Sequence, residues 1–215
     1  SSAASDVYKR QLLVRGVEVI QQPDTLLSLE SLNVRVQAWP LLKGKVEVDE
    51  VTLSQVAVNS ANLIEGMQIK GVLGRFFLQS HGVDLSNETA VVNRTELSDT
   101  HIQLLMTDTT TTPKDTTASA PVNWKVNLHQ LKLKNVSFGM KLPADSMKMA
   151  AYIGEATIDD AKADLKNQFY GLKQFLLSGA SASYDTGEAQ PSEGFDASHM
   201  AVRNIRIGLD SLLYE

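Results

Sequence analysis

The feature that most constrains this chain is a recurring pattern of apolar pairs. Residues 46–58 read VEVDEVTLSQVAV, in which two apolar residues lie two apart and each new pair begins five residues after the last. Residues two apart share one face of a β-strand, whereas at 100° per residue the same positions scatter around a helix. The β-branched valines also favour a strand. The pattern therefore predicts β-structure.

The spacing of these pairs also predicts bends in the strands. Because five is an odd number, a flat strand would send alternate pairs to opposite faces. The polar doublets Asp49-Glu50 and Ser54-Gln55 between the pairs must therefore supply turns, bulges or bends. A curled sheet would then keep all the pairs on one side.

The phrase recurs as an internal repeat. Residues 126–138 read VNLHQLKLKNVSF, and 46 + 80 = 126. An ungapped alignment at this offset also matches Met67 with Met147, Gly74 with Gly154, Asp84-Leu85 with Asp164-Leu165, Asn87 with Asn167, and Leu97-Ser98 with Leu177-Ser178. A third copy begins at Met200 with MAVRNIRI, which resembles residues 126–133. Repeats of this kind are typical of elongated, stacked architectures.

These patterns predict a mainly β fold. We expect an elongated, curled antiparallel sheet, shaped as a groove or half-pipe and made of repeats of about 80 residues. Few short helices are expected, with a turn or two of helix at Ser86–Thr95 and at Ala161–Tyr170. The predicted divisions are a first repeat with its leading segment at 12–106, a flexible Thr-rich loop at 107–121, a second repeat at 122–185, a loop at 186–194 and the start of a third repeat at 195–215.

The two ends of the sequence suggest a piece of a longer protein. Residues 1–11, ending in DVYKRQ, resemble an adapter-derived peptide and are set aside as non-native. The last residues, LLYE, stop within the apolar pattern and without a turn signal. We therefore expect that the natural protein continues beyond both ends.

Composition excludes several classes of function. Hydrophobic residues make up 43% of the 215, enough for a substantial core. The net charge of −5 is spread along the chain without a Lys/Arg block, so a nucleic-acid partner is not expected. The absence of cysteine removes disulfide scaffolds, zinc knuckles and thiol catalysis. No apolar run approaches the about 18 to 20 residues of a membrane-spanning helix.

No motif in the sequence predicts catalysis or a cofactor. None of the four histidines has a histidine partner three or four residues away, so no metal site is predicted. The glycines at 66, 71 and 74 match neither a dinucleotide fingerprint nor a phosphate loop. Asp159, Asp160 and Asp164 lack the alternating ligands of a calcium loop. We assign no catalytic residue and predict that the protein is not an enzyme.

Three segments carry a resemblance to a known family. They are residues 13–36, residues 39–48 with the phrase WPLLKGKVEV, and residues 195–201 with the phrase FDASHMA leading into the third apolar phrase. They resemble the N-terminal periplasmic part of AsmA/TamB-like proteins, the translocation and assembly modules, in the form found in Bacteroidota. The resemblance covers about residues 12–215, and its motifs are short β-strand patterns without a catalytic signature.

The resemblance implies a place and a role in the cell envelope. Such a protein is anchored in the inner membrane by an upstream helix and crosses the periplasm as an apolar β-groove, which carries phospholipid between the inner and outer membranes for outer-membrane biogenesis. Its implied partners are phospholipid acyl chains and an outer-membrane barrel of the Omp85 type, similar to TamA. The alternative is a structural scaffold on which outer-membrane β-barrels or autotransporters assemble by β-strand addition.

The physical case for lipid transport starts from the cost of exposing acyl chains to water. At about 0.8 kcal/mol per CH₂, a chain of about sixteen carbons faces a barrier of roughly 12 kcal/mol, which a continuous apolar trough would remove. The alternative is that the same side chains pack against each other as a closed core. The candidate lining residues are Val46, Val48, Val51, Leu53, Val56, Val58, Val126, Leu128, Leu131, Leu133, Val136 and Phe138.

Overall fold

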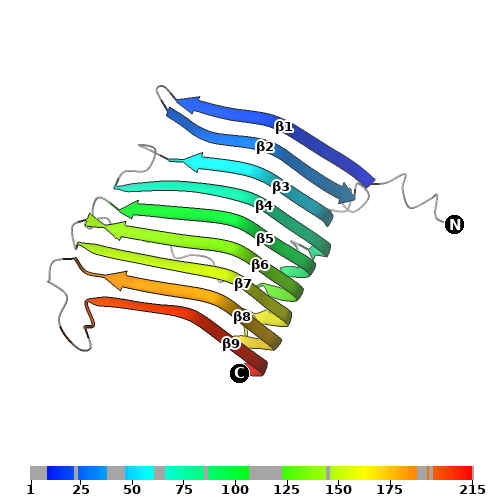
Figure 1. Cartoon of the computed structure of the whole chain (residues 1–215). Helices are drawn as coiled ribbons and strands as arrows, with labels where there is room; N and C mark the ends of the chain where they lie inside the picture. Colours follow the sequence, from blue (N-terminus) through cyan, green and yellow to red (C-terminus); the bar gives the residue numbers. More distant parts are fainter. Residues whose placement is uncertain are drawn as a thin grey trace.

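Nine strands in sequential order form one open sheet (Figure 1). The computed structural model describes residues 9–21, 24–37, 47–60, 66–84, 87–106, 123–143, 146–187, 193 and 196–214. The strands are β1 (Lys9–Gln21), β2 (Asp24–Gln37), β3 (Glu47–Asn59), β4 (Met67–Asp84), β5 (Thr89–Met106), β6 (Lys125–Leu142), β7 (Met147–Asp164), β8 (Phe169–Asp185) and β9 (His199–Tyr214). The predicted mainly β, curled sheet is confirmed.

The pairing of the strands departs from the prediction at one place. Seven of the eight neighbouring pairs are antiparallel, but β5 and β6 are parallel. A parallel neighbour requires the chain to return to the end of the sheet where the previous strand began. The segment that makes this return, residues 107–122, lies outside the described residues, and so does the predicted Thr-rich loop at 107–121.

The prediction of two short helices from the sequence is wrong. Of residues 86–95 and 161–170, those that the structure describes are strand or turn. The reason is a side-chain turn: Asp164 accepts hydrogen bonds from the backbone nitrogen of Asn167 at 3.1 Å and from its Nδ2 at 2.8 Å. Asp84 and Asn87 make the same two bonds at the same distances. Asp side chains that bond the backbone in this way favour chain reversal over helix.

Some strands begin or end eighty residues apart, which is the offset of the sequence repeat. Strand β7 begins and ends eighty residues after β4 (67 to 147 and 84 to 164), and β8 begins eighty after β5 (89 to 169). Strand β9 begins 74 residues after β6 (125 to 199). The division into repeats stays a prediction. Residues 9–11, set aside with the adapter-like peptide, form the start of β1.

The strands bend together along a first bend row. Gln55, Asp99 and Asn135 have φ of 49°, 51° and 53°, and the pairing register steps over each of them. The row crosses the sheet through Gly16, Glu30, Gln55, Gly74, Asp99, Asn135, Gly154, Gly179 and Asn204. In the pairs β3–β4, β5–β6 and β6–β7 both strands leave one residue unpaired and the register does not shift, and the left-handed residues change the direction of the strands there. Figure 1 shows the common bend near the middle of the strands.

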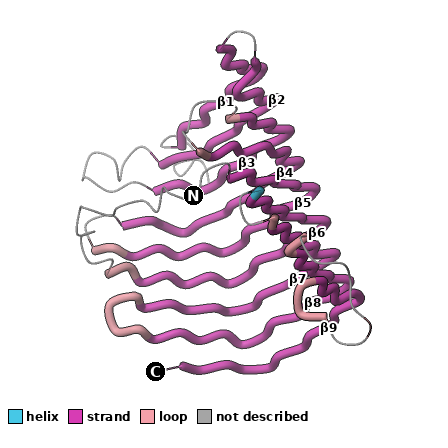
Figure 2. Tube along the Cα trace, turned by 90° about the vertical axis from the view of Figure 1, so that its left-hand side faces the viewer, coloured by secondary structure: helices cyan, strands magenta, loops and turns pink. Residues whose placement is uncertain are grey.

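A second bend row runs parallel to the first. The register steps over Asn93, His129 and Asp160 in β5, β6 and β7, and over Ser211 in β9. Asp160 and Ser211 have φ of 49° and 65°. We call the part of the sheet between the two bend rows the floor, and the parts beyond each row the walls. Figure 2 shows the folded sheet.

Two glycines allow neighbouring strands to approach at the first bend row. A Cβ added to Gly74 would lie 2.6 Å from the Cβ of Asp99 and 2.8 Å from its carbonyl oxygen. A Cβ on Gly154 would lie 3.0 Å from the carbonyl oxygen of Gly179. Gly74 and Gly154 therefore sit opposite left-handed residues of the next strand, where a side chain would not fit.

Candidate functional site

Apolar side chains run across the sheet in continuous rows on one face, which we call the apolar face. The two rows of the floor follow the register from strand to strand. The first is Leu12, Val34, Val51, Leu78, Thr95, Leu131, Ile158, Phe175 and Leu209, and the second is Val14, Leu32, Leu53, Phe76, Leu97, Leu133, Ala156, Leu177 and Ile207. Of these eighteen positions, one is polar. The rows run at right angles to the strands and therefore along the trough.

The first bend row keeps the predicted lining residues on this face. In β3 the register passes from Ser54–Arg75 to Val56–Leu73, so Gln55 lies opposite Gly74 and the pairing register does not shift. The left-handed backbone of Gln55 interrupts the alternation of the strand, so Val56 returns to the face of Leu53. Asn135 does the same in β6. By alternation the apolar face carries the described candidates, namely Val48, Val51, Leu53, Val56, Val58, Val126, Leu128, Leu131, Leu133, Val136 and Phe138; Val46 lies outside the described residues.

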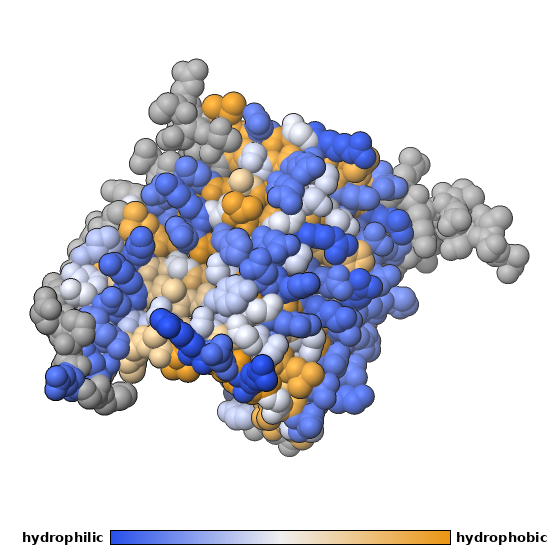
Figure 3. All heavy atoms as spheres, in the orientation of Figure 1, coloured by the Kyte–Doolittle hydropathy of each residue, from blue (hydrophilic) through white to orange (hydrophobic). Residues whose placement is uncertain are grey.

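The apolar face lies on the inside of the bend. In β6, Leu131 and Leu133 are half-buried, whereas Lys132 and Lys134 on the opposite face are exposed. Thr100 and Ala180, beside the first bend row on the apolar face, are 2% and 4% exposed. A flat single layer would expose both faces alike, so this difference follows from the curvature. Figure 3 views the sheet from a side on which hydrophilic side chains predominate over the bent middle of the strands.

No second layer within the described residues covers the apolar face. Two hydrophobic side chains of the described chain, Ala156 and Ala180, are buried. On the wall beyond the first bend row, Ile102, Phe138 and Val202 are 41%, 43% and 57% exposed. Soluble proteins rarely leave a large contiguous apolar surface uncovered unless it binds something. The described part of the chain thus forms an open apolar trough.

The opposite face, which we call the polar face, is stabilised by charged pairs. The guanidinium of Arg94 donates to Glu96 Oε1 at 3.0 Å, and Arg75 Nη1 lies 3.3 Å from Glu96 Oε2. The guanidinium groups of Arg75 and Arg94 lie over the ring of Phe77, at 5.4 and 5.1 Å from its centroid, respectively. The hydrogen bond from Arg94 lowers the pKa of Glu96, and that of Arg94 is raised in turn. This cluster ties β4 to β5 on the solvent side.

The histidines also lie on polar parts of the sheet. His129 Nδ1 lies 3.1 Å from Asp160 Oδ1 in the second bend row, and Lys173 Nζ lies 3.7 Å from Asp160 Oδ2. The hydrogen bond with His129 lowers the pKa of Asp160. The other three have separate partners: His81 bonds Asn93, His101 bonds Ser137, and His199 contacts Asp185 and Asp196. Each histidine therefore serves a local cross-strand or turn contact.

The acidic side chains and histidines of the described residues do not gather into a metal site. These residues contain no group of three or more His, Asp, Glu or Cys side chains placed to hold a metal ion. The three aspartates considered for calcium have different partners: Asp159 accepts from Gln130, Asp160 pairs with His129, and Asp164 pairs with Lys125. Among the described residues no helix is long and apolar enough to cross a membrane.

Comparison with known proteins places the chain in no family. No protein-family model matches it. No curated protein matches it at a significant level. The resemblance to AsmA/TamB-like proteins therefore stays a prediction, and the apolar trough has to be interpreted from its own geometry.

Sequence reasoning missed part of this arrangement. The repeat phrases identified apolar pairs in β3 and β6, but Leu78, Phe76, Ile158 and Phe175 in the strands between complete the same rows. A signal was present, since Phe76 and Leu78 lie two apart after Gly74. Their membership of the rows depends on register, which the sequence of one strand does not specify.

Proposed function

We propose that this chain forms part of a conduit for phospholipid acyl chains. The observation that carries the proposal is the apolar face, whose rows run from β1 to β9 and which no described part of the chain covers. A closed core, the alternative reading of the same residues, requires a second layer or a sealed barrel. The described strands form one curled sheet in which β1 and β9 do not pair.

The dimensions of the trough suit an acyl chain. Nine strands have eight spacings of about 4.8 Å, so the rows extend over roughly 38 Å. One leaflet of a bilayer has a hydrocarbon depth of roughly 15 Å, half of its core of about 30 Å. An acyl chain would therefore find apolar contacts along its whole length and further equivalent positions beyond it. Successive similar rows favour sliding, because no single position binds much more tightly than the next.

The proposed setting follows from the resemblance described above. In a longer chain anchored in the inner membrane, the trough would span part of the periplasm and carry phospholipid between the two membranes. The polar face would meet water, and lipid headgroups would remain at the open side of the trough.

A charge placed in the trough tests this function. Leu128→Glu puts a carboxylate among apolar side chains, where its desolvation is costly for a passing acyl chain. Asn127→Glu is the matched control, because the side chain of Asn127 is exposed on the polar face, whereas that of Leu128 is half-buried. We expect phospholipid that co-purifies with the chain, measured by mass spectrometry, to fall by at least about tenfold in Leu128→Glu and to stay unchanged in Asn127→Glu. Equal loss in both variants would contradict the proposal.

The scaffold alternative makes a different prediction. Assembly by strand addition uses the backbone of an edge strand and does not require an open apolar face. A chain with that role alone would carry no co-purifying phospholipid, and Leu128→Glu would leave its capture of unfolded barrel proteins intact. Both measurements on the same two variants therefore separate the two functions.

A further inference from the structure

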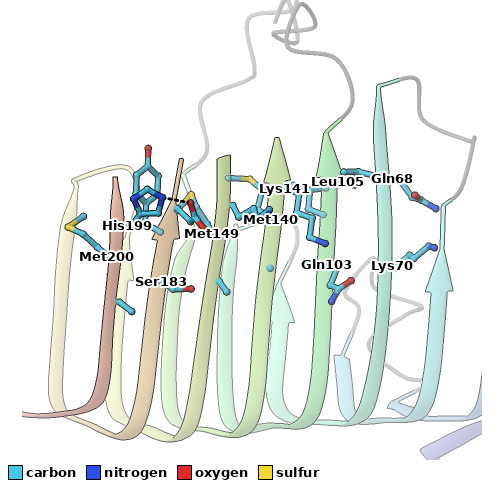
Figure 4. Close-up of a pocket in the computed structure, with 17 residues that line it drawn as sticks. Gln68, Lys70, Gln103, Leu105, Met140, Lys141, Met149, Ser183, His199 and Met200 are labelled. Carbon is cyan, nitrogen blue, oxygen red and sulfur yellow. Dashed lines mark ion pairs between the residues drawn. The ribbon is translucent and has the colours of Figure 1, made fainter. Parts of the chain in front are cut away.

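A second hollow lies on the polar face, on the opposite side of the sheet from the trough. It has a volume of about 640 Å³ and is lined from β4 to β9 at one end of the strands (Figure 4). Gln68 and Lys70 line it, whereas Ile69, which lies between them and faces the apolar side, does not. Since successive residues of a strand face opposite sides, the hollow opens on the polar face. Its volume is within the range of small-molecule pockets.

Lysines give this hollow its charge. Lys141 and Lys148 are directly opposite each other in the register of β6 and β7, and Lys70 lines the hollow from β4. Like charges placed opposite each other across two strands are destabilising. All three lysines are exposed, and no described carboxylate forms an ion pair with them.

One described carboxylate, Asp185, also lines the hollow, and it lies directly opposite Lys148 in the register of β7 and β8. Asp185 Oδ1 lies 3.3 Å from His199 Nε2 and accepts a hydrogen bond of 2.7 Å from the backbone nitrogen of Gly187. Asp185 therefore offsets part of the positive charge, and three lysines against one described carboxylate leave the lining net positive. An anion at this place would relieve the repulsion between Lys141 and Lys148.

The surroundings of the lysines are apolar and spacious. Gly139 and Ala150 are direct partners in the register, and Ser183 and Ala201 continue their row on β8 and β9. These small side chains leave room above the sheet on the polar face. Leu105, two residues after Gln103, lies on the same face and also lines the hollow. The site thus combines a cationic border with a base of small and apolar side chains.

We propose that this hollow binds an anionic amphiphile, a phosphate or carboxylate group joined to an aliphatic chain. The anionic group lies between Lys141 and Lys148, with Lys70 as the third cation, and the first part of the chain lies over Gly139 and Ala150. The site is separate from the trough and does not depend on the transport function proposed for it. The same chemistry is shared by a phospholipid phosphate and by a fatty-acid carboxylate.

The test compares probes that differ in one feature. Binding of dodecyl phosphate, dodecanoate and dodecylphosphocholine, each below its micelle concentration, is measured calorimetrically on the whole chain. We expect dodecyl phosphate or dodecanoate to bind at least about tenfold more tightly than the zwitterionic dodecylphosphocholine, and the tighter of the two identifies the anionic group. Equal affinity for all three probes, or equal affinity for inorganic phosphate alone, would overturn the proposal.

Paired variants locate the binding on the polar face. Lys141→Gln with Lys148→Gln should lose at least about tenfold in affinity for the anionic probe, whereas Lys141→Arg with Lys148→Arg should retain it, which excludes misfolding as the cause. Lys132→Gln with Lys134→Gln removes the same charge from the polar face elsewhere and should have no effect. Leu128→Glu, which blocks the trough, should also leave this binding unchanged. Loss of binding in Leu128→Glu, with none in the Lys141/Lys148 variant, would assign the probe to the trough and overturn the proposal.

Discussion

At the scale of single residues, the first bend row depends on which side chains tolerate a left-handed backbone. Gln55, Asp99, Asn135 and Asn204 hold positive φ without being glycine, and Asn and Asp adopt this conformation more readily than most residues. In addition, Asn135 Nδ2 donates to Asp99 Oδ1 at 2.7 Å, so two left-handed residues of neighbouring strands support each other. The bend is thus encoded by polar residues placed between apolar pairs.

Gly74 gives the sharpest test at this scale. Gly74→Ala would place a Cβ against backbone and side-chain atoms of Asp99, and we expect it to lower the free energy of unfolding by about 1 to 3 kcal/mol. Gly139→Ala is the control, because nothing lies within 3.7 Å of its added Cβ, and it should be neutral or stabilising by up to about 1 kcal/mol. Urea denaturation of both variants measures the difference. Equal stability of the two would contradict the close approach at the first bend row.

Much of this bend could be predicted from the sequence. The odd spacing of the pairs predicted a turn, bulge or bend at the doublet Ser54-Gln55, and the structure has a left-handed residue at Gln55. The matching doublet Lys134-Asn135 holds the left-handed residue of β6. The hollow on the polar face could not be foreseen, because Lys141 and Lys148 come together through the register of two strands, and local sequence does not specify it.

At the scale of the elements, identical turns close two hairpins. Asp84 and Asp164 each bond the residue three positions later, and the next residues, Glu88 and Gln168, have φ of 52° and 55°. The sequence analysis predicted a turn or two of helix just after each of these aspartates. The side-chain bonds decide for reversal, and the following strands begin within a few residues.

The turn at Asp164 makes stability depend on pH. The side chain and backbone of Asn167, with Lys125, lower the pKa of Asp164 below its ordinary value. A carboxyl with a lowered folded-state pKa stabilises the fold above its unfolded pKa of about 4 and loses this contribution as pH falls through the folded value. We expect the urea midpoint of the unchanged chain to fall more between about pH 6 and about pH 2.5 than that of Asp164→Asn.

A second variant checks the cause of this pH dependence. Asn167→Ala removes the donor side chain that contributes most to the lowered pKa. Its midpoint should therefore show a pH dependence between those of the unchanged chain and Asp164→Asn. If all three chains lose stability in parallel, the turn does not hold the ionised carboxylate as described.

The parallel junction of β5 and β6 is the element that the sequence did not reveal. Strand β6 follows β3 by three strands, which is an odd number, so a purely antiparallel order would make β6 run opposite to β3. The parallel pair lets β6 run in the same direction as β3. Strand order across a long connection depends on long-range pairing, and local pattern carries no information on it.

At the scale of the whole molecule, the two bend rows and the apolar rows together make one open trough. The rows cross every strand without interruption by the parallel junction, since Thr95 pairs with Leu131 and Leu97 with Leu133. Most of the apolar surface remains partly exposed, which in a soluble domain would favour aggregation or a bound partner. An acyl chain is a partner of the right shape and chemistry for such a surface.

We propose that acyl chains occupy the apolar face and not the polar face. The most direct test of this proposal is a photocrosslinker placed at Leu53 and Leu133 on the apolar face, and in separate chains at their neighbours Thr52 and Lys132 on the polar face. With radiolabelled phospholipid, we expect crosslinked lipid at Leu53 and Leu133, and at most background at Thr52 and Lys132. Equal labelling of both faces, or none at either, would contradict the account.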